Sequence, residues 1–486
     1  MKLGELAGAG HSLPDDMSRV DICGLTADSR DVSPGFLFAA LPGTQTDGAK
    51  FIPQALENGA AAILVPQDTS LPAKEGLAVI EEPDARRAFA LMAARFFARQ
   101  PDTIVAVTGT SGKSSIVSYV RQLWQALGHQ AASLGTIGIE TPSGMKKGGL
   151  TTPDPVLLHR ELAELADEGV THLALEASSH GLQQRRLDGV WFAAAAFTNL
   201  SRDHLDYHPT FEDYLAQKLR LFRTLLPEGA SVVVNADSDM AGPVAAAAKE
   251  RSLPLITVGQ TGDTLRLLDV ERDGFSQHLR VEHEGGICDV TLPLVGEFQA
   301  SNALVAAGLC MACGAEAGDI LPLMEELIGA KGRLELVGTS AKGAPVFVDY
   351  AHKPDALAKV LDALRPYAQG RLAVVFGCGG DRDKGKRPEM GQIAGRKADV
   401  VIVTDDNPRG EDPAAIRAEI LETAPTAREI ADRGKAIETA ISELEAGDIL
   451  VIAGKGHEKG QVVGDTVLPF SDHEAATNVL GQGAAT

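Results

Sequence analysis

A short glycine loop between a predicted strand and a predicted helix limits most strongly what this chain can fold into. Residues 104–107 are apolar and mostly β-branched, which is typical of a buried parallel strand. The run TGTSGKS follows at residues 108–114, and a helical pattern extends to about residue 127. Backbone N–H groups of such a loop and the positive end of the helix attract phosphate. The segment therefore predicts an anion site at a strand end of an α/β sheet.

The loop is a shortened form of the common phosphate-binding loop. Two residues separate its glycines instead of four, because Val107 stands where the first glycine would be. Lys113 can reach the β- and γ-phosphates of a nucleotide, and the Ser114 hydroxyl can hold Mg²⁺. The order of strand, glycine, lysine, hydroxyl and helix favours a nucleotide site over a chance glycine-rich turn. We expect ATP to contact Gly109, Thr110, Ser111, Gly112, Lys113, Ser114 and Ser115.

Composition excludes several classes of protein. The chain has 486 residues, 44% hydrophobic and 23% charged, which are ordinary globular values and predict roughly three domains. No run of 18 or more apolar residues is present, and the first residues lack the apolar core of a signal peptide, so we expect no membrane span and no secretion. Five scattered cysteines suit a reducing cytoplasm, and Cys310 and Cys313 are expected to pack in a helical core rather than bind a metal.

The acidic balance of the chain also bears on its ligands. A formal net charge of −21 argues against nucleic-acid binding. An ATP-type ligand is itself strongly anionic, so binding it requires local positive charge and metal ions. Lysine and arginine residues within glycine-rich segments are therefore the first candidates for binding residues.

The alternation of apolar strands and helical patterns predicts an α/β fold of three domains. A small N-terminal α/β domain, residues 1–98, is expected to contain a strand at 62–65 and a helix at 83–99. A central doubly wound parallel sheet, residues 99–331, is expected to have strands at 104–107, 172–176, 193–198 and 231–235, a β-like segment at 255–295 and a helix over 302–328. A C-terminal Rossmann-like α/β domain, residues 332–486, is expected to have strands at 346–348, 372–376, 400–404 and 449–453 and a helix from Asp412 to about 421.

Polar side chains follow two further strands of the central domain. Glu176 ends the strand at 172–176, where a carboxylate near a phosphate loop is well placed for Mg²⁺, although a solvated strand end is an equally simple interpretation. Residues 199–208, after the next strand, contain Asn199, Asp203, His204, Asp206 and His208, which indicates a metal or phosphate site with some capping groups. Lys218 lies in a helical pattern, and periodicity alone predicts a surface lysine there.

Three polar loops follow three strands of the C-terminal domain, at residues 377–388, 405–409 and 454–458. Because the carboxyl ends of parallel strands lie at one edge of a sheet, these loops should form one rim. Arg382 and Arg409 suit bidentate capture of a carboxylate, and Glu458 can accept hydrogen bonds from an ammonium group. The combination favours an amino acid that carries both charges.

Together these segments resemble the Mur ligase family of ATP-dependent amide-forming enzymes over essentially the whole chain. The resemblance rests on TGTSGKS, EASSHG (176–181), TNLSRDHLD (198–206), Lys218, Asn302, Gly332 with Arg333, and DYAHKP (349–354). Within the family, TADSR (26–30), TTPDP (151–155), GDRDKGKR (380–387) and DNPR (406–409) are similar to the branch that adds meso-diaminopimelate.

The resemblance implies a reaction and the residues that perform it. The chain would join meso-2,6-diaminopimelate to UDP-N-acetylmuramoyl-L-alanyl-D-glutamate through an acyl phosphate, with ATP and Mg²⁺, in peptidoglycan precursor synthesis. The implied catalytic residues are Lys113, Glu176, His204 and Lys218, and the implied Mg²⁺ ligands are Ser114, Glu176, His204 and Lys218 as a carbamate. Asn302, Arg333 and Asp349 would contact the nucleotide together with the glycine loop.

Two further sets of residues are implied for the other substrates. The UDP-muramoyl-dipeptide would be bound by Ala27, Ser29, Thr44, Gln45, Thr46, Thr151, Thr152, Ser178, Gln184 and Arg186. Diaminopimelate would be bound by Arg382, Asp406, Asn407, Pro408, Arg409, Gly454 and Glu458.

The chain departs from the family pattern at Gln299, often asparagine in relatives, and at Leu150, where some relatives have a polar side chain.

Three alternative functions would explain part or most of these features. A lysine-adding relative would share everything except the amino-acid rim. A folylpolyglutamate synthetase would share the central domain without needing the first domain. A P-loop ATPase or nucleotide-binding regulator would account for the glycine loop alone.

Overall fold

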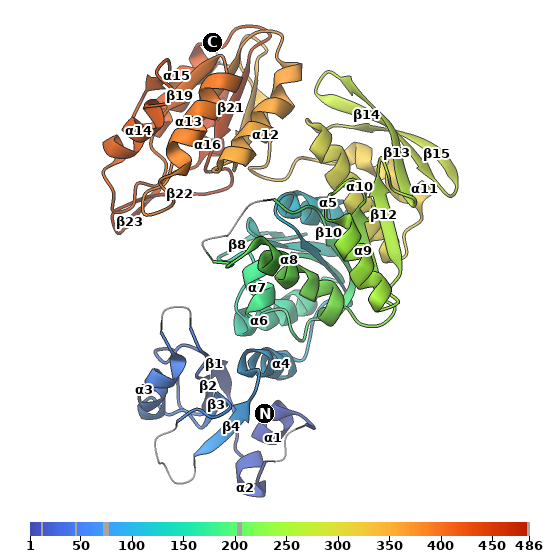
Figure 1. Cartoon of the computed structure of the whole chain (residues 1–486), viewed down its shortest axis with the longest axis vertical. Coiled ribbons are helices and arrows are strands. Elements are labelled where there is room, and N and C mark those ends of the chain that lie inside the picture. The colour runs from blue at the N-terminus through green and yellow to red at the C-terminus, as the bar shows by residue number, and fades with distance from the viewer. Residues whose placement is uncertain (11–12, 44–45, 71–76, 202–206, 484–486) are drawn as a thin grey trace. The chain divides into compact units, whose positions relative to one another are not determined.

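The structure is a computed structural model, and it describes residues 1–10, 13–43, 46–70, 77–201 and 207–483. The chain forms two compact units. Met1–Arg266 with Val305–Ile320 make up the first, and Leu267–Leu304 with Leu321–Thr486 make up the second. Sheets of largely parallel strands flanked by helices build both units, which confirms the predicted α/β class (Figure 1).

The N-terminal part contains a four-stranded parallel sheet in the order β1-β2-β3-β4. Its strands are β1 (Gly24–Thr26), β2 (Phe36–Ala39), β3 (Ala62–Pro66) and β4 (Ala78–Glu82), and its helices are α1 (Leu3–Ala7), α2 (Asp15–Ser18), α3 (Ile52–Glu57) and α4 (Ala85–Phe97). Asp84 caps α4 by accepting a hydrogen bond from the Arg87 N–H. Phe89 and Met92 of α4 are buried against the sheet, so the predicted strand at 62–65 and the predicted helix at 83–99 are confirmed.

The central sheet has eleven strands in the order β15-β14-β13-β12-β11-β10-β5-β9-β6-β7-β8. Its strands are β5 (Thr103–Thr108), β6 (Ala131–Gly135), β7 (Gly138–Thr141), β8 (Gly144–Lys147), β9 (His172–Glu176), β10 (Phe192–Phe197), β11 (Ser231–Asn235), β12 (Leu255–Gly259), β13 (Leu265–Asp273), β14 (Ser276–His283) and β15 (Gly286–Leu292). Its helices are α5 (Lys113–Ala126), α6 (Pro155–Asp167), α7 (Ser179–Gln183), α8 (Phe211–Arg220), α9 (Ala241–Glu250), α10 (Glu297–Ala312) and α11 (Ala317–Leu323). Because β5 lies between β9 and β10 and all three are parallel, their carboxyl ends meet at one edge.

Two features of this region differ from the sequence prediction. The predicted single helix over 302–328 is wrong, since α10 ends at Ala312 and α11 begins at Ala317. Gly314, at φ +101°, provides the left-handed turn that ends a helix. Cys310 is buried in α10, as expected. The strands β6, β7 and β8 were not predicted, because their small and polar residues lack a clear apolar run.

The C-terminal sheet has six strands in the order β16-β17-β21-β18-β19-β20. Its strands are β16 (Glu335–Thr339), β17 (Pro345–Asp349), β18 (Leu372–Phe376), β19 (Val400–Val403), β20 (Arg428–Glu429) and β21 (Ile449–Ala453), and a separate hairpin consists of β22 (Gly460–Val463) and β23 (Thr466–Pro469). The helices are α12 (Pro354–Leu364), α13 (Lys386–Lys397), α14 (Pro413–Leu421), α15 (Arg433–Ser442) and α16 (Asp472–Gly483). The four strands predicted here are confirmed, and the Asp412 side chain caps α14 as expected.

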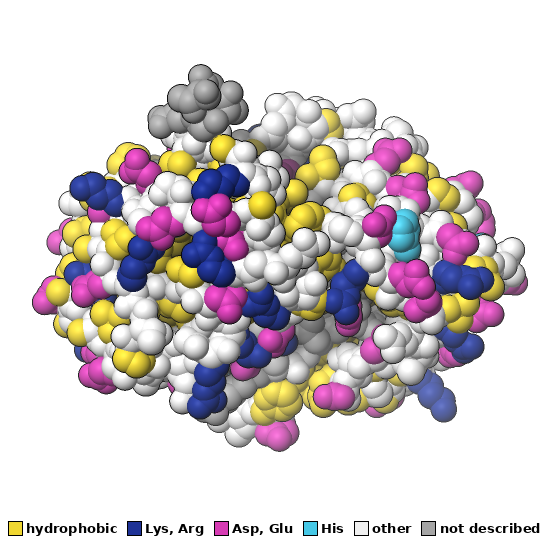
Figure 2. Space-filling view, turned by 90° about the horizontal axis from the view of Figure 1, so that it is seen from above, with side chains coloured by type: hydrophobic (Ala, Val, Ile, Leu, Met, Phe, Trp, Pro, Cys, Tyr) yellow, Lys and Arg dark blue, Asp and Glu magenta, His cyan; other side chains and the backbone are white. Residues whose placement is uncertain are grey.

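Figure 2 shows basic and acidic side chains interspersed over the face it presents, so the positive charge there does not gather into one broad patch. Within the described parts of the chain, no helix is long and apolar enough to cross a membrane.

Candidate active site

The phosphate loop joins the end of β5 to the start of α5. The Lys113 ammonium group donates to the carbonyl oxygens of Gly109, at 3.0 Å, and Thr110, at 2.9 Å. The end of β10 holds the loop from the other side: Asn199 Oδ1 accepts from the Ser111 N–H at 3.0 Å, and the Thr198 hydroxyl donates to the Ser111 carbonyl at 2.7 Å. The loop is thus held by residues that follow β10, and it leads into the start of α5, where a helix N-terminus favours an anion.

Gly109 leaves no room for a side chain in this loop. Its φ is +144°, and a Cβ atom there would lie 1.9 Å from the Thr198 hydroxyl oxygen. We expect Gly109→Ala to displace Thr198, break its bond to the loop and raise the KM for ATP by at least about 10-fold. Gly128→Ala is the matched control, because Gly128 also has a positive φ, +88°, but nothing lies within 4 Å of its added Cβ. Equal kinetics for the two variants would show that the close approach at Gly109 is unimportant.

Lys218 lies against the same loop. Its side chain is buried, and its ammonium donates to the Gly109 carbonyl at 2.6 Å and sits 4.5 Å from the centre of the Tyr214 ring. The prediction of a surface lysine from periodicity alone is therefore wrong. Lys218 stands four residues after Tyr214 and seven after Phe211, within the apolar stripe of α8, and this spacing was the overlooked signal.

Glu176, at the end of β9, is almost fully buried, so it is not a solvated strand end. Its Oε1 accepts from the Thr136 N–H at 2.9 Å and its Oε2 accepts from the Thr136 hydroxyl at 3.1 Å. Glu176 pairs with Val107 in the sheet, two residues before Gly109. A buried carboxylate is therefore fixed beside the phosphate loop, on the neighbouring strand.

The residues around α7 form a continuous polar cluster next to Glu176. The Thr152 hydroxyl donates to the Glu176 carbonyl at 2.9 Å and accepts from the Ser178 hydroxyl at 3.0 Å. The Arg186 guanidinium donates to the Thr152 carbonyl at 2.7 Å and to Gln184 Oε1 at 2.8 Å. Burial lowers the pKa of Arg186. Thr151 joins the cluster through Thr136, at 2.9 Å between the two hydroxyl oxygens.

The other residues expected to bind the UDP-muramoyl-dipeptide are placed differently. Ser29 is buried in the N-terminal part, where its hydroxyl donates to Gln54 at 2.7 Å. Ala27 and Thr46 are exposed on loops of the same part. No hydrogen bond between described residues joins these three to the cluster around α7. Thr44, Gln45 and His204, together with Asp203 and Asp206, lie outside the residues that the structure describes.

His208, which ended the polar run after β10, connects two helices. Its side chain is fully buried, with Nε2 2.9 Å from the Ser179 hydroxyl of α7 and Nδ1 3.0 Å from Asp213 of α8. The position of His208 is thus explained by packing between the helix after Glu176 and the helix that carries Lys218. In the part of the chain that the structure describes, no three His, Cys, Asp or Glu side chains converge as a metal site.

Two of the three further residues expected to contact the nucleotide, Arg333 and Asp349, lie near the start of the C-terminal sheet. Asp349 is buried and accepts from the N–H groups of Leu334, at 2.6 Å, and Ala351, at 2.7 Å. Burial raises its pKa to about 6 against the opposing effect of Arg333. The Arg333 guanidinium lies 4.5 Å from the centre of the Tyr350 ring. Asn302, on α10, donates to Gln299 Oε1 at 3.0 Å. Gln299, one of the two positions where the chain departs from the family pattern, therefore supports Asn302 directly.

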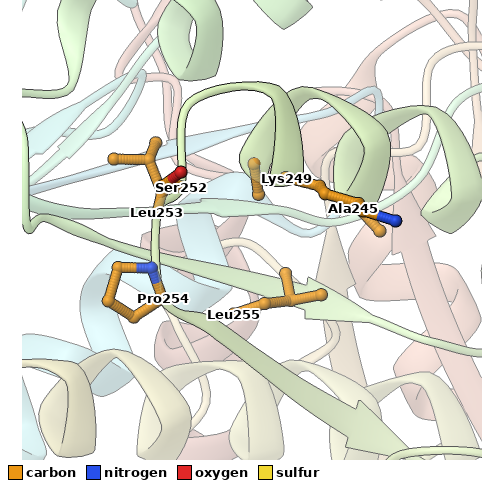
Figure 3. A pocket seen from close by; sticks show the side chains of 7 residues that line it. Ala245, Lys249, Ser252, Leu253, Pro254 and Leu255 are labelled. Atoms are coloured by element: carbon orange, nitrogen blue, oxygen red, sulfur yellow. The ribbon is translucent and has the colours of Figure 1, made fainter.

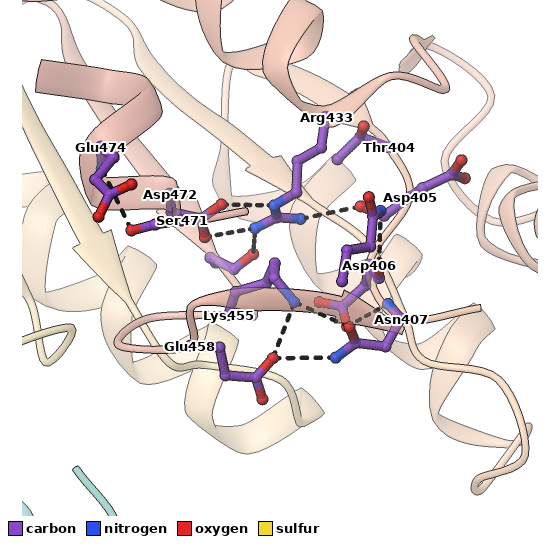
Figure 4. A network of polar contacts seen from close by, with 12 residues as sticks. Thr404, Asp405, Asp406, Asn407, Arg433, Lys455, Glu458, Ser471, Asp472 and Glu474 are labelled. Carbon is purple, nitrogen blue, oxygen red and sulfur yellow. Dashed lines mark hydrogen bonds and ion pairs between the residues drawn. The ribbon is translucent and has the colours of Figure 1, made fainter. Parts of the chain in front are cut away.

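The three loops of the C-terminal rim contact one another. The Gly380 N–H donates to the Asn407 carbonyl at 2.9 Å, and the Arg409 guanidinium donates to the Gly380 carbonyl at 2.9 Å. The Asn407 side-chain amide donates to Glu458 Oε2 at 3.0 Å (Figure 4). Asp406, Pro408 and Gly454 are buried within the rim, whereas Arg382 is exposed. The predicted rim is therefore formed.

Several side chains that support the rim were not identified from the sequence. Arg387 is fully buried and pairs with Glu411, whose carboxylate also accepts from the Asp381 N–H at 2.6 Å. Hydrogen bonds to Arg387 lower the pKa of Glu411 to about 2. Arg433 and Asp472 form a fully buried ion pair behind the rim, at 2.6 Å (Figure 4). No local spacing marks these pairs, because their partners are distant in sequence.

A cavity elsewhere in the central part is unrelated to these sites. It has a volume of about 460 Å³ and is lined by Ala245, Ala248, Lys249, Ser252, Leu253, Pro254 and Leu255 (Figure 3). Leu255 begins β12, so the cavity lies at the amino edge of the sheet. The phosphate loop and Glu176 lie at the carboxyl edge, where parallel sheets bind ligands.

Models of known families match three successive parts of the chain. The Mur ligase family catalytic domain matches residues 21–97, the Mur ligase middle domain matches residues 107–310, and the Mur ligase glutamate ligase domain matches residues 332–456. The chain belongs to the Mur ligase family. It therefore has the three-domain fold of this family and is an ATP-dependent, ADP-forming amide ligase. The interpretation as a nucleotide-binding regulator is excluded.

Three individual proteins are similar to this chain over nearly its whole length. The UDP-N-acetylmuramoyl-L-alanyl-D-glutamate–2,6-diaminopimelate ligase of Bradyrhizobium diazoefficiens is 57% identical, with all of both chains covered. The ligase of the same name from Rhizobium meliloti is 54% identical over 99% of this chain and 100% of its own. A solved structure of a ligase of that name is 33% identical, covers 100% of both chains and has a TM-score of 0.74.

Proposed function

We propose that this chain joins meso-2,6-diaminopimelate to UDP-N-acetylmuramoyl-L-alanyl-D-glutamate, with conversion of ATP to ADP and phosphate, as a cytoplasmic step of peptidoglycan precursor synthesis. The observation that carries the proposal is the C-terminal rim, where the DNPR loop contacts both Gly380 and Glu458. A guanidinium and a carboxylate on one rim suit an amino acid with both charges. The names of the relatives at 57% and 54% identity support the same substrates.

The three parts of the chain would each bind one substrate. Residues 1–98 would contribute to the UDP-muramoyl site, residues 99–331 would bind ATP, and residues 332–486 would bind diaminopimelate. The ranges matched by the three family models, which break between residues 97 and 107 and between 310 and 332, support these boundaries.

The chemistry requires activation of a carboxylate, because a carboxylate does not accept an amine at neutral pH. The substrate carboxylate would attack the γ-phosphorus of ATP, which breaks the bond to ADP and forms an acyl phosphate. The amine of diaminopimelate would then attack the acyl carbon, phosphate would leave, and loss of a proton from nitrogen would give the amide. Positioning and stabilisation of phosphoryl charge supply most of the catalysis in such transfers.

The residues of the phosphate loop would bind ATP for the first of these two steps, the transfer of its γ-phosphoryl group. Lys113 and the N–H groups of residues 109–115 would hold the phosphate oxygens, while Asn302, Arg333 and Asp349 would contact the rest of the nucleotide. The polar cluster of Thr151, Thr152, Ser178, Gln184 and Arg186 lies beside Glu176, where it would orient the carboxylate that is activated. Ala27, Ser29, Thr44, Gln45 and Thr46 would bind the remainder of the UDP-muramoyl group.

The donor set beside the loop fits Mg²⁺. The buried Ser114 hydroxyl and the buried Glu176 carboxylate are hard oxygen donors, and His204 would assist them. Lys218 fits only as a carbamate, because an ammonium group repels a cation, and carbamylation would convert it into an oxygen ligand. When bound, Mg²⁺ would neutralise phosphate charge at this edge of the sheet.

The test of the function is ADP release by the purified chain. Release is measured with ATP alone, then with the UDP-muramoyl-dipeptide, and then with diaminopimelate, lysine or glutamate added. We expect release only with both the UDP-substrate and diaminopimelate. Release with lysine instead would identify a lysine-adding enzyme. A parallel assay with a folate substrate and glutamate replaces the UDP-substrate, and release there would identify a folylpolyglutamate synthetase.

Arg409 is expected to select diaminopimelate over lysine. The two amino acids differ by a carboxylate at the far end, which a guanidinium can engage through two hydrogen bonds. We expect Arg409→Ala to weaken diaminopimelate binding by roughly 2–5 kcal/mol while the KM for ATP changes little. The measurement is the ratio of kcat/KM for diaminopimelate over lysine.

The controls for this prediction separate charge from geometry. Arg409→Lys should restore only part of the loss, because an ammonium group lacks the planar fork. Arg396→Ala, which removes an exposed arginine of α13, should leave the ratio unchanged. The ratio in Arg409→Ala decides the assignment: if it equals that of the wild type, selection resides outside the DNPR loop.

A further inference from the structure

A lysine without an assigned role lies directly behind the amino-acid rim. Lys455 follows β21, and its side chain is fully buried. Its ammonium donates to Asn407 Oδ1 at 3.0 Å and to Glu458 Oε2 at 2.9 Å (Figure 4). Asn407 and Glu458 also contact each other, so the three side chains form a closed triangle.

The backbone explains why this lysine points into the domain. Gly454 and Gly456 flank it with φ angles of +117° and +53°. A Cβ atom at Gly454 would lie 2.9 Å from Asp406 Oδ2, and one at Gly456 would lie 2.8 Å from the Gly332 carbonyl oxygen. Both glycines therefore allow a tight turn pressed against other loops, and this turn directs the intervening lysine inward.

The triangle fixes the orientation of the Asn407 amide. Its Oδ1 accepts from Lys455 and, at 2.9 Å, from the Val462 N–H. Both groups are donors only, so the oxygen must face them and the NH₂ group must face Glu458. Lys455 and Asn407 then both donate to Oε2 of Glu458. Glu458 is held by one oxygen, and its side chain keeps 32% of its surface exposed.

We propose that Lys455 is a positioning residue for the incoming amino acid, holding Glu458 and Asn407 so that the Oε1 atom of Glu458 is presented to the substrate ammonium. This inference rests on the proposed function, which places diaminopimelate at this rim. Lys455 itself does not touch the substrate. Without it, Asn407 Oδ1 and Glu458 Oε2 each lose a donor and Glu458 can rotate, so the acceptor for the ammonium is no longer fixed.

The first test replaces Lys455 with methionine, which has a similar length and no charge. We expect the KM for diaminopimelate to rise about 10- to 100-fold, while the KM values for ATP and the UDP-substrate stay within about 2-fold. Lys459→Met removes an exposed lysine four residues away and should change none of the three. An equal rise of all three KM values would indicate a merely structural role and overturn the proposal.

A double-mutant comparison then tests whether Lys455 acts through Glu458. Glu458→Gln alone should raise the KM for diaminopimelate, and adding Lys455→Met should raise it little further, because the partner is already altered. Independent, multiplying effects would contradict the positioning role. If Lys455→Met does not fold, as judged by its thermal unfolding, Lys455→Gln retains a donor at the buried site. Lys455→Gln should still raise the KM for diaminopimelate selectively, and wild-type kinetics for it would refute the inference.

The wild type distinguishes failure of this inference from failure of the proposed function. If the wild-type chain does not release ADP with diaminopimelate, the function itself is wrong. If the wild type is active and Lys455→Met keeps its KM for diaminopimelate, only the role of Lys455 is wrong.

Discussion

Lys218→Ala is expected to abolish ligation. Lys218 is buried against the phosphate loop, 2.6 Å from the Gly109 carbonyl oxygen, and as a carbamate it would supply an anionic oxygen ligand that alanine lacks. We expect kcat to fall by at least about 10³-fold, the scale on which charge at a transferring phosphoryl group acts. The measurement is ADP release with all substrates present, together with thermal unfolding, because the side chain is buried.

Chemical rescue distinguishes a carbamate from an ammonium. If Lys218 is carbamylated, added formate or acetate should partly restore activity in Lys218→Ala by filling the gap with a carboxylate. Lys249→Ala, which removes an exposed lysine of α9, should behave as the wild type with and without the acids. Rescue by short amines instead of acids would indicate that Lys218 works as a cation. A fully active Lys218→Ala enzyme would remove Lys218 from the active site altogether.

The sequence predicts those parts of the fold and site that depend on local pattern. The strand at 104–107, the glycine loop and the following helix form a continuous segment, so their geometry follows from neighbouring residues. The rim at residues 377–388, 405–409 and 454–458 could likewise be inferred, since each loop follows an apolar strand and parallel strands end at one edge. The short strands β6, β7 and β8 could not be predicted, because their sequences lack a clear apolar run, although β6 is buried in the sheet.

The distant partners of some side chains could not be predicted from local sequence. Periodicity alone predicts that Lys218 lies at the surface. The structure shows that it contacts Gly109 of the phosphate loop, 109 residues earlier in the chain. Lys455 is similar, because Asn407, 48 residues earlier, is one of its two partners. Burial of a lysine is costly unless such a partner exists. A glycine on each side of Lys455, and an apolar stripe around Lys218, are the local signals that accompany these buried lysines.

Lys113→Ala is expected to produce the other of the two largest losses. In this structure the Lys113 ammonium is held by the carbonyl oxygens of Gly109 and Thr110 at the mouth of the loop. These two carbonyl groups are neutral, so neither cancels the charge of Lys113. Removing a cation from a transferring phosphoryl group costs about 10³- to 10⁵-fold in rate, and we expect the loss in kcat to be of this order.

The position of Lys113 also predicts which properties of the protein Lys113→Ala leaves unchanged. Lys113 donates to two carbonyl oxygens of the loop, and the diaminopimelate site is proposed in the C-terminal sheet. We therefore expect Lys113→Ala to unfold at nearly the same temperature as the wild type and still to bind diaminopimelate. Lys146→Ala is a suitable control, because Lys146 of β8 pairs with Glu168 at the surface, and such pairs contribute little. Single-turnover formation of ADP is the decisive measurement, since it isolates phosphoryl transfer from amide formation. Rapid ADP formation followed by failure to form the amide would assign Lys113 to the second step instead, and the glycine loop would then hold the acyl phosphate rather than activate ATP.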